Sequence, residues 1–360
     1  MIDPHVHLRD WRQNRKETVR HGLATARKAG LDGIFEMPNT DPPLISRRTI
    51  QRRLDLADSA GVPIFHGIYA GLTPDPSQIE EMVRAHRDLF PRVVGLKMFA
   101  GKSTGNLAIV EEERQREVLR HLTRLGYSGV LAVHCEKESL MNAGLWDPEA
   151  PLSHTLARPP EAERESIRDI LGFCREAGFG GTLHVCHVSV ASAIELIRRE
   201  KDRSAIRVTC GVTPHHLLLS QERLIGRAGL FLKVNPPLRS EENRRALLKS
   251  LYDGQIDWIE TDHAPHTLEE KLTGGDRCPS GMPGLPVYPL LIRWLRQQGM
   301  EESALQRVTH KSIESTFGIR IDPAGTPVGT PAGSPERLDL AGEYDYDPYD
   351  RFPFQEHPMF

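Results

Sequence analysis

Eight short apolar runs alternate with amphipathic stretches along the chain, at a repeat of about 30 residues. The runs predict strands at residues 3–10, 33–37, 62–69, 93–99, 129–135, 182–188, 206–212 and 256–262. Helices are expected at 15–29, 46–60, 79–86, 111–125, 161–177, 191–199 and 287–298. Strands that alternate with helices predict a parallel sheet, and eight such units predict an α/β fold, the closed (β/α)8 or TIM-like barrel.

A doubly wound open sheet is the competing architecture. Polar side chains lie near the ends of many of the expected strands, namely His5, His7, Asn39, Lys97, His134, His187 and Asp262. In a barrel the carboxyl ends of all strands open into one mouth, so these side chains would meet there. Their distribution over many different strands therefore favours the barrel.

The composition excludes several classes of protein. The chain has 360 residues, of which 39% are hydrophobic, and a formal net charge of −3, which predicts no strong attraction to nucleic acid or an anionic membrane. No apolar run approaches the roughly 20 residues of a spanning helix. Five cysteines without CxxC spacing indicate no disulfide framework, and the first strand follows Met1 without room for a signal peptide. A cytoplasmic protein is expected.

The first expected strand carries two histidines, His5 and His7, that project from one face. A lone HxH pair is often accidental, but further metal-binding side chains end other strands: His134, His187 and Asp262. Four imidazoles and one carboxylate at one mouth predict a divalent metal site, most simply zinc.

Strand parity separates neighbouring candidates on the sixth strand. His184 and His187 are three residues apart and face opposite ways on a strand, so only one can point into the mouth. His187 lies nearer the strand's end and is taken as the ligand, which makes His184 a structural histidine. The same argument turns Cys135 and Cys186 toward the helix layer.

Lys97 is unusual in an apolar strand, because a protonated lysine beside a dication is strongly disfavoured. Either its amine points elsewhere as a structural group, or it has reacted with carbon dioxide to give a carbamate. The carbamate is an anionic ligand with two oxygens, able to bridge two metals. The residues alone leave both alternatives open.

Seven motifs in chain order carry a resemblance to a known family. They are Asp3-Pro4-His5-Val6-His7-Leu8-Arg9-Asp10, Met37-Pro38-Asn39-Thr40, Gly95-Leu96-Lys97, Val133-His134-Cys135, His184-Val185-Cys186-His187-Val188-Ser189, Val234-Asn235-Pro236-Pro237-Leu238-Arg239 and Thr261-Asp262-His263-Ala264-Pro265-His266. Through them the chain from residue 1 to about 320 resembles the dihydroorotases of the cyclic amidohydrolase superfamily. HxH alone marks the superfamily, whereas HxHxR with the Asp-His-Ala-Pro-His run is far more specific.

The resemblance implies two zinc ions per subunit at the mouth of the barrel. His5, His7 and Asp262 would hold one ion, His134 and His187 the other, and carboxylated Lys97 with a hydroxide would bridge them. It also implies a reaction, the reversible cyclisation of N-carbamoyl-L-aspartate to L-dihydroorotate in de novo pyrimidine biosynthesis. Asp262 would serve as general acid and base.

Substrate contacts follow from the same resemblance. Dihydroorotate carries a carboxylate, which the guanidinium of Arg9 can bind in a bidentate way. Asn39 and His266 resemble further carboxylate and ring contacts, and Asn235 resembles a residue that binds the amide edge of the ring. The loop at 101–106 is either a closing lid or an ordinary surface loop.

The chain departs from the family pattern in two places. The family's small β-sandwich domain is expected to be absent or vestigial, which leaves a barrel domain at 1–318 and an extended tail at 319–360 that is rich in Pro, Gly and aromatic residues. The tail is expected to wrap the barrel or dock on a second subunit. Where the family commonly has an acidic residue, this chain has Gly211, which puts support for the metal ligands near strand seven in doubt.

Two rival functions are weighed. A hydantoinase, allantoinase or dihydropyrimidinase would have the same metals but no need for Arg9. An inactive scaffold for a transcarbamoylase could lose ligands, yet each expected ligand position is filled. The resemblance implies a small-molecule substrate, a homodimer and possible binding to a transcarbamoylase.

Overall fold

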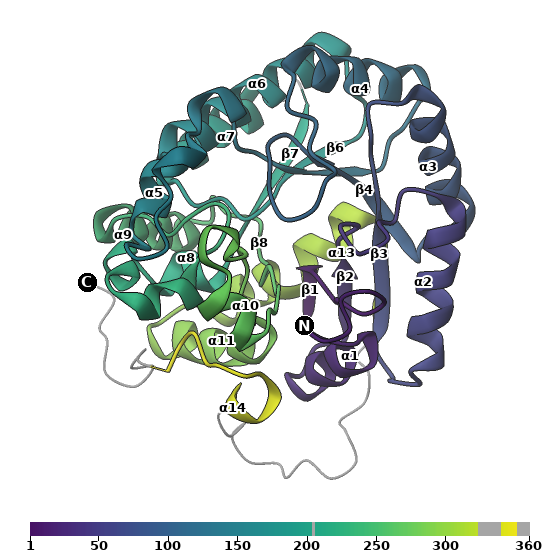
Figure 1. Ribbon diagram of the computed structural model, residues 1–360. Helices are drawn as coiled ribbons and strands as arrows, with labels where there is room; N and C mark the ends of the chain where they lie inside the picture. The colour runs from purple at the N-terminus through teal and green to yellow at the C-terminus, as the bar shows by residue number, and fades with distance from the viewer. Residues whose placement is uncertain (204–205, 323–339, 351–360) are drawn as a thin grey trace.

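The computed structural model describes residues 1–203, 206–322 and 340–350, and its eight strands form one parallel sheet in sequential order (Figure 1). The strands are β1 Ile2–Val6, β2 Gly33–Glu36, β3 Phe65–Gly71, β4 Val93–Phe99, β5 Val130–His134, β6 Thr182–Val185, β7 Arg207–Val212 and β8 Trp258–Ile259. A parallel bridge between Val6 and His263 joins the first strand to the segment after the last. The predicted (β/α)8 barrel is therefore confirmed, and the open sheet is excluded.

Helices surround the strands as an outer ring (Figure 1). The longer ones are α1 Val19–Lys28, α2 Arg47–Ser59, α3 Pro76–Leu89, α4 Glu112–Arg124, α6 Pro160–Ala177, α7 Ala191–Arg203, α9 Glu241–Tyr252 and α11 Tyr288–Gln297. The shorter ones are α5 Ser153–Ala157, α8 Pro214–Leu218, α10 Leu268–Thr273, α12 Glu302–Gln306, α13 Ser312–Phe317 and α14 Leu340–Glu343. Short 3-10 turns and one π-helical turn, Arg307–Lys311, complete the connections. None of the helices in the described residues has the length and apolar character that crossing a membrane requires.

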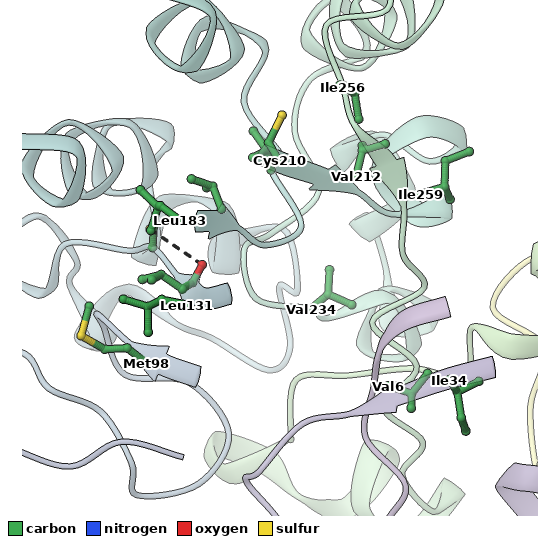
Figure 2. Packing of buried hydrophobic residues seen from close by; sticks show 14 of the residues in the cluster. Val6, Ile34, Met98, Leu131, Leu183, Cys210, Val212, Val234, Ile256 and Ile259 are labelled. Atoms are coloured by element: carbon green, nitrogen blue, oxygen red, sulfur yellow. Dashed lines mark hydrogen bonds between the residues drawn. The ribbon is translucent and has the colours of Figure 1, made fainter. Parts of the chain in front are cut away.

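Two apolar clusters fill the structure, one on each side of the strands. Leu131 and Val133 of β5 belong to the cluster between the sheet and the helices, whereas Val130 and Ala132 belong to the cluster inside the barrel. This alternation is the period-two pattern of a strand. Figure 2 shows part of the outer cluster, with side chains from β1, β2 and β4 to β8. Phe317 of α13 closes the inner cluster from below, with its ring 5.0 Å from that of Phe35.

Two predicted elements differ from the structure. β8 has two residues instead of the seven expected at 256–262, because the chain leaves the sheet after Ile259 and Asp262 has a positive φ of 50°. The helix α9, which connects β7 to β8, was not among the predicted helices. Its polar residues, such as Glu241 and Arg244, leave only a narrow apolar stripe in the sequence.

Arg53 on α2 is fully buried, although its neighbours Arg47, Arg48 and Arg52 form an exposed face. The sequence pattern of four arginines on this helix predicts a solvated face, and this prediction is wrong for Arg53. Its guanidinium forms an ion pair with Glu36 and donates to the carbonyl oxygens of Leu8 and Arg9, the latter at 2.7 Å. This buried pair fixes the backbone just after β1.

We expect Arg53→Met to lower the free energy of unfolding by about 3–5 kcal/mol, because the variant leaves the Glu36 carboxylate buried without its cation. Urea denaturation followed by circular dichroism measures the change. Arg48→Met is the matched control, since Arg48 lies exposed on the same helix. Equal midpoints for the two variants would contradict the role assigned to Arg53.

The described part of the C-terminal tail packs on the barrel. The Tyr344 hydroxyl donates to Glu17 at 2.7 Å, and Glu343 forms an ion pair with Lys28 at 2.6 Å. Tyr346 and Tyr349 are also buried. Phe352 and Phe354 lie outside the described residues. Within the described ranges there is no second sheet, while the division of the chain near residue 318 stays a prediction.

Candidate active site

The first group of predicted metal ligands comes from the two ends of the barrel sheet. His5 lies in β1, His7 follows that strand, and Asp262 follows β8. The Nε2 atoms of His5 and His7 lie 3.3 Å and 2.9 Å from the same Asp262 oxygen, Oδ1. All three side chains are buried, and their ligand atoms lie within 4.8 Å of one another. This is a donor set suited to zinc.

The second group joins two neighbouring strands. His134 ends β5, and His187 lies two residues beyond β6. Nδ1 of His134 faces Nε2 of His187 at 3.2 Å, and the His5 and His187 rings are 5.1 Å apart. The two groups therefore adjoin at one mouth.

Backbone strain marks one ligand in each group. His187 has a φ of 36° and Asp262 a φ of 50°, which L-residues adopt at a cost of about 1–3 kcal/mol. The alternation of β6 continues through Cys186, which therefore points into the barrel and not toward the helix layer as predicted, and it ends only at the turn of His187. Cys135 does lie in the outer cluster.

His184 is satisfied below the site, as expected of a structural histidine. Its Nδ1 lies 3.1 Å from the Thr209 hydroxyl, its Nε2 lies 3.0 Å from Glu260, and its ring stacks on Trp258 at 4.3 Å. Because the parity of β6 breaks at His187, both His184 and His187 are directed into the barrel, at different depths.

The amine of Lys97 is fully buried inside the barrel, 3.1 Å from Sγ of Cys186. Among the described residues no carboxylate lies within 4.0 Å of it. Burial raises the pKa of Cys186, but the Lys97 charge and hydrogen bonds with His184 and His5 outweigh it and lower the pKa to about 5, so a thiolate lies against the buried ammonium. Its position also disfavours a metal ion among His5, Cys186 and Glu260, although these three could otherwise hold one.

Burial favours the neutral form of most of the ligand histidines. It lowers the pKa of His7 to about 4, and holds that of His187 well below its usual range. Burial and the Lys97 charge also lower the pKa of His5, but hydrogen bonds with Cys186 and Glu260 outweigh them and raise it to about 10. For Asp262, burial raises the pKa, but His7 and His5 outweigh it and hold the pKa well below its usual range.

Arg9 lies in the same cavity as the ligand residues and is 2% exposed. Its guanidinium donates to the Pro265 carbonyl at 3.2 Å and contacts Nε2 of His266 at 3.2 Å. Within the described ranges no carboxylate lies within 4.0 Å of this guanidinium. The arrangement leaves a buried positive charge facing a cavity.

Of the three other predicted substrate contacts, Asn39 and Asn235 line the cavity and His266 does not. Asn39 lines the cavity, but its Oδ1 lies 2.7 Å from Nδ1 of His7, which makes it a group that orients this ligand. Asn235 also lines the cavity, with its Oδ1 3.0 Å from Nε2 of His154. His266 lies behind Arg9 and is not among the lining residues.

The loop at 101–106 covers one side of the cavity. Ser103 and Thr104 line it, the Thr104 carbonyl accepts from Asn39 at 2.9 Å, and the Thr104 hydroxyl donates to the Ser280 carbonyl at 3.1 Å. The backbone carbonyl and the side-chain hydroxyl of Thr104 thus both hold the loop against the site. Movement of the loop as a lid stays a prediction.

Two buried carboxylates were missed by the sequence reasoning. Glu136 forms an ion pair with Arg158 and lies 3.0 Å from Nε2 of His134. Glu260 contacts His184 and lies 3.5 Å from Nδ1 of His5. Glu136 comes just after β5, which ends in the ligand His134, and Glu260 comes directly after the apolar strand β8. An acidic residue just beyond a strand end was the sequence signal that could have revealed them.

Solved structures share this architecture. L-hydantoinase from Arthrobacter aurescens matches with a TM-score of 0.78 at 24% identity, over 92% of this chain and 73% of that one. D-hydantoinase from Thermus sp. matches with a TM-score of 0.72 at 21% identity. Fold and site together define an amidohydrolase-type barrel whose mouth carries residues able to hold a metal ion.

Relatives of known name narrow this class. The dihydroorotase of Brevibacillus brevis is 37% identical over 308 residues, 83% of this chain and 68% of the relative. Those of Methanosarcina mazei and Bacillus cereus are 33% and 34% identical, over 88% and 97% of this chain and 69% and 78% of the relatives. The chain belongs to the dihydroorotase family. No family model matches it.

Proposed function

We propose that this chain is a zinc-dependent dihydroorotase that interconverts N-carbamoyl-L-aspartate and L-dihydroorotate. The observation that carries the proposal is the buried guanidinium of Arg9, which has no carboxylate within 4.0 Å in the described residues and lines the same cavity as His5, His7 and Asp262. A substrate with its own carboxylate would supply the missing anion. Neutral hydantoins and dihydropyrimidines would leave the charge unpaired.

The residues present fit two zinc ions. His5, His7 and Asp262 would hold one, while His134 and His187, whose facing nitrogens are 3.2 Å apart, would hold the other. Lys97, buried without a carboxylate neighbour in the described ranges, fits a carbamate that would bridge the two ions. Zinc bound there would supply a Lewis acid and a water of lowered pKa.

Side chains of the protein itself would transfer the proton, orient a metal ligand and orient the substrate. Asp262, which stays ionised at neutral pH, would accept a proton from the attacking water and deliver it to the ring nitrogen as the bond from carbonyl carbon to nitrogen breaks. Asn39 would keep His7 in the tautomer that presents Nε2 to a metal, because its Oδ1 accepts from Nδ1–H. Arg9 would orient the ring through the substrate carboxylate, and Asn235 and His266 would complete this side of the pocket.

The proposal extends to the cellular setting. The enzyme would be cytoplasmic, act in pyrimidine biosynthesis and form a homodimer. Its barrel would span residues 1–318 and its tail residues 319–360. An interaction with a transcarbamoylase also stays a prediction.

Metal content and turnover test the proposal together. We expect the purified protein to hold about two zinc ions per chain and to convert both dihydroorotate and carbamoyl-aspartate, with little turnover of hydantoin or dihydrouracil. An inert protein without zinc would move the scaffold alternative to the front. Preference for the neutral rings would favour a hydantoinase-type enzyme.

We expect His134→Ala to reduce the zinc content from about two ions to about one per chain and to abolish turnover in both directions, because the second pair loses one of its two imidazoles. Elemental analysis and both activity assays measure this. His310→Ala is the control, since His310 lies on the π-helical turn below the barrel and pairs with Glu314. Unchanged zinc content in His134→Ala would remove this residue from the ligand set.

A further inference from the structure

Glu260 places a fully buried carboxylate directly beneath the candidate metal site. Oε1 accepts from the His187 backbone N–H at 2.6 Å and lies 3.5 Å from Nδ1 of His5. Oε2 lies 3.0 Å from Nε2 of His184 and accepts from the Trp258 indole at 3.0 Å. One carboxylate therefore touches a residue from each of the two ligand groups.

The Glu260 carboxylate occupies the space that a side chain at position 211, on the neighbouring strand, would need. A Cβ atom built on Gly211 would lie 2.5 Å from Cδ of Glu260 and 2.7 Å from each of its oxygens. The φ of Gly211 is not positive, so volume and not backbone conformation requires a glycine there. Any side chain at position 211 would displace the Glu260 carboxylate.

Strand pairing explains how the two positions share one space. Gly211 of β7 pairs with Trp258 of β8, Val212 pairs with Ile259, and the Glu260 N–H donates to the Val212 carbonyl at 3.0 Å. Glu260 therefore follows directly on β8 and still lies beside β7. Its side chain bends back over Gly211, into the place where the family resemblance predicts an acidic residue of strand seven.

We infer that Gly211 and Glu260 form a reciprocal pair, in which β8 supplies the positioning carboxylate that relatives would supply from β7. The carboxylate orients the His5 imidazole and holds the strained His187 backbone, so that both present their nitrogens to the mouth. Because Gly211 has no side chain, it leaves room for the Glu260 carboxylate. The inference rests on the proposed function, because His5 and His187 are metal ligands only under that proposal.

Glu260 is a positioning residue and not a catalytic one, since it is not among the residues that line the cavity. A histidine that binds a metal through one nitrogen commonly gives its other N–H to a carboxylate, and loss of that partner costs about 10–100-fold in metal affinity. A residue that only fills the core would change stability without this effect on affinity. Zinc affinity therefore separates the two roles.

The test compares wild type with Glu260→Ala, Gly211→Glu and the double variant Gly211→Glu/Glu260→Ala. Zinc affinity is measured by competition with a chelator, and the thermal midpoint is measured on the metal-free proteins. We expect each single variant to bind zinc about 10–100-fold more weakly. Glu260→Ala removes the carboxylate, and Gly211→Glu forces two carboxylates into one space.

The double variant is expected to recover zinc affinity to within about threefold of wild type, because the carboxylate returns to the same place from β7. Gly211→Ala/Glu260→Ala is the matched control, which fills the volume without restoring the charge and is expected to stay weak. A double variant as weak as the singles overturns the inference, even if a single variant fails to fold. So does a Glu260→Ala protein that keeps the zinc affinity of wild type.

The zinc measurements use no substrate, which separates this inference from the proposed function. A wild-type protein that binds zinc but does not turn over dihydroorotate would refute the proposed substrate, while recovery of zinc affinity in the double variant would still support the reciprocal pair. A wild-type protein that turns over dihydroorotate, together with no recovery, would refute the pair alone.

Discussion

Asp262→Asn is expected to lower turnover by about 10³-fold, because the proposed proton carrier is lost. The amide cannot accept a proton, and it removes the negative charge between the imidazoles of His5 and His7. Because a substitution cannot change the equilibrium between the two substrates, kcat/KM must fall by the same factor for ring opening and ring closure. Steady-state assays in both directions measure this.

The zinc content of the same variant separates the two roles of Asp262. Retained zinc with lost turnover assigns the loss to proton transfer, and lost zinc assigns it to ligation. Asp253→Asn on the exposed end of α9 is the matched control for loss of a carboxylate. Asp262→Asn turnover above about a tenth of wild type would show that another group carries the proton.

Arg9→Met is expected to lower kcat/KM for dihydroorotate by about 10²–10³-fold, with little change for neutral cyclic ureides. Truncating one partner of a buried charge pair costs about 2–5 kcal/mol, and Arg9 is 2% exposed. Most of the loss should appear in KM, because the carboxylate is bound in the ground state and the transition state alike. Rates for dihydroorotate and hydantoin measure the ratio.

Arg9→Lys is the matched control for this prediction. A lysine keeps the positive charge but lacks the planar fork, so it should recover part of the lost affinity and not all of it. Equal losses for dihydroorotate and the neutral ring in Arg9→Met would mean that Arg9 supports the cavity and does not bind the carboxylate.

The strand pattern was sufficient to predict the barrel, and β4 has the same bounds in the structure as in the prediction. Parity failed where the chain leaves the sheet. The argument for Cys186 assumed that β6 continues to position 188, but β6 ends at Val185 and His187 turns to a positive φ. Such turns depend on contacts with other strands, which a local period does not contain.

Contacts between distant residues were the other source of error. Arg53 looked like one of four surface arginines, and its burial depends on Glu36 in the preceding strand. Glu260 was passed over within an apolar run, and its role becomes visible only beside Gly211 of the adjacent strand. The sequence marked Gly211 as a departure, but it did not reveal where the replacement carboxylate lies.

The order of the ligands along the chain separates the two halves of the candidate centre in time as the ribosome makes the protein. The pair of His134 and His187 is the first ligand group to be completed during synthesis. His5 and His7 are made earlier, but their group is completed only by Asp262, which is 75 residues beyond His187. At about 5–20 residues per second this interval lasts about 4–15 s. Tyr344, which buttresses the Glu17–His263 contact beside Asp262, arrives later still. This contact beside Asp262 therefore stays incomplete until the segment around Tyr344 has left the ribosome.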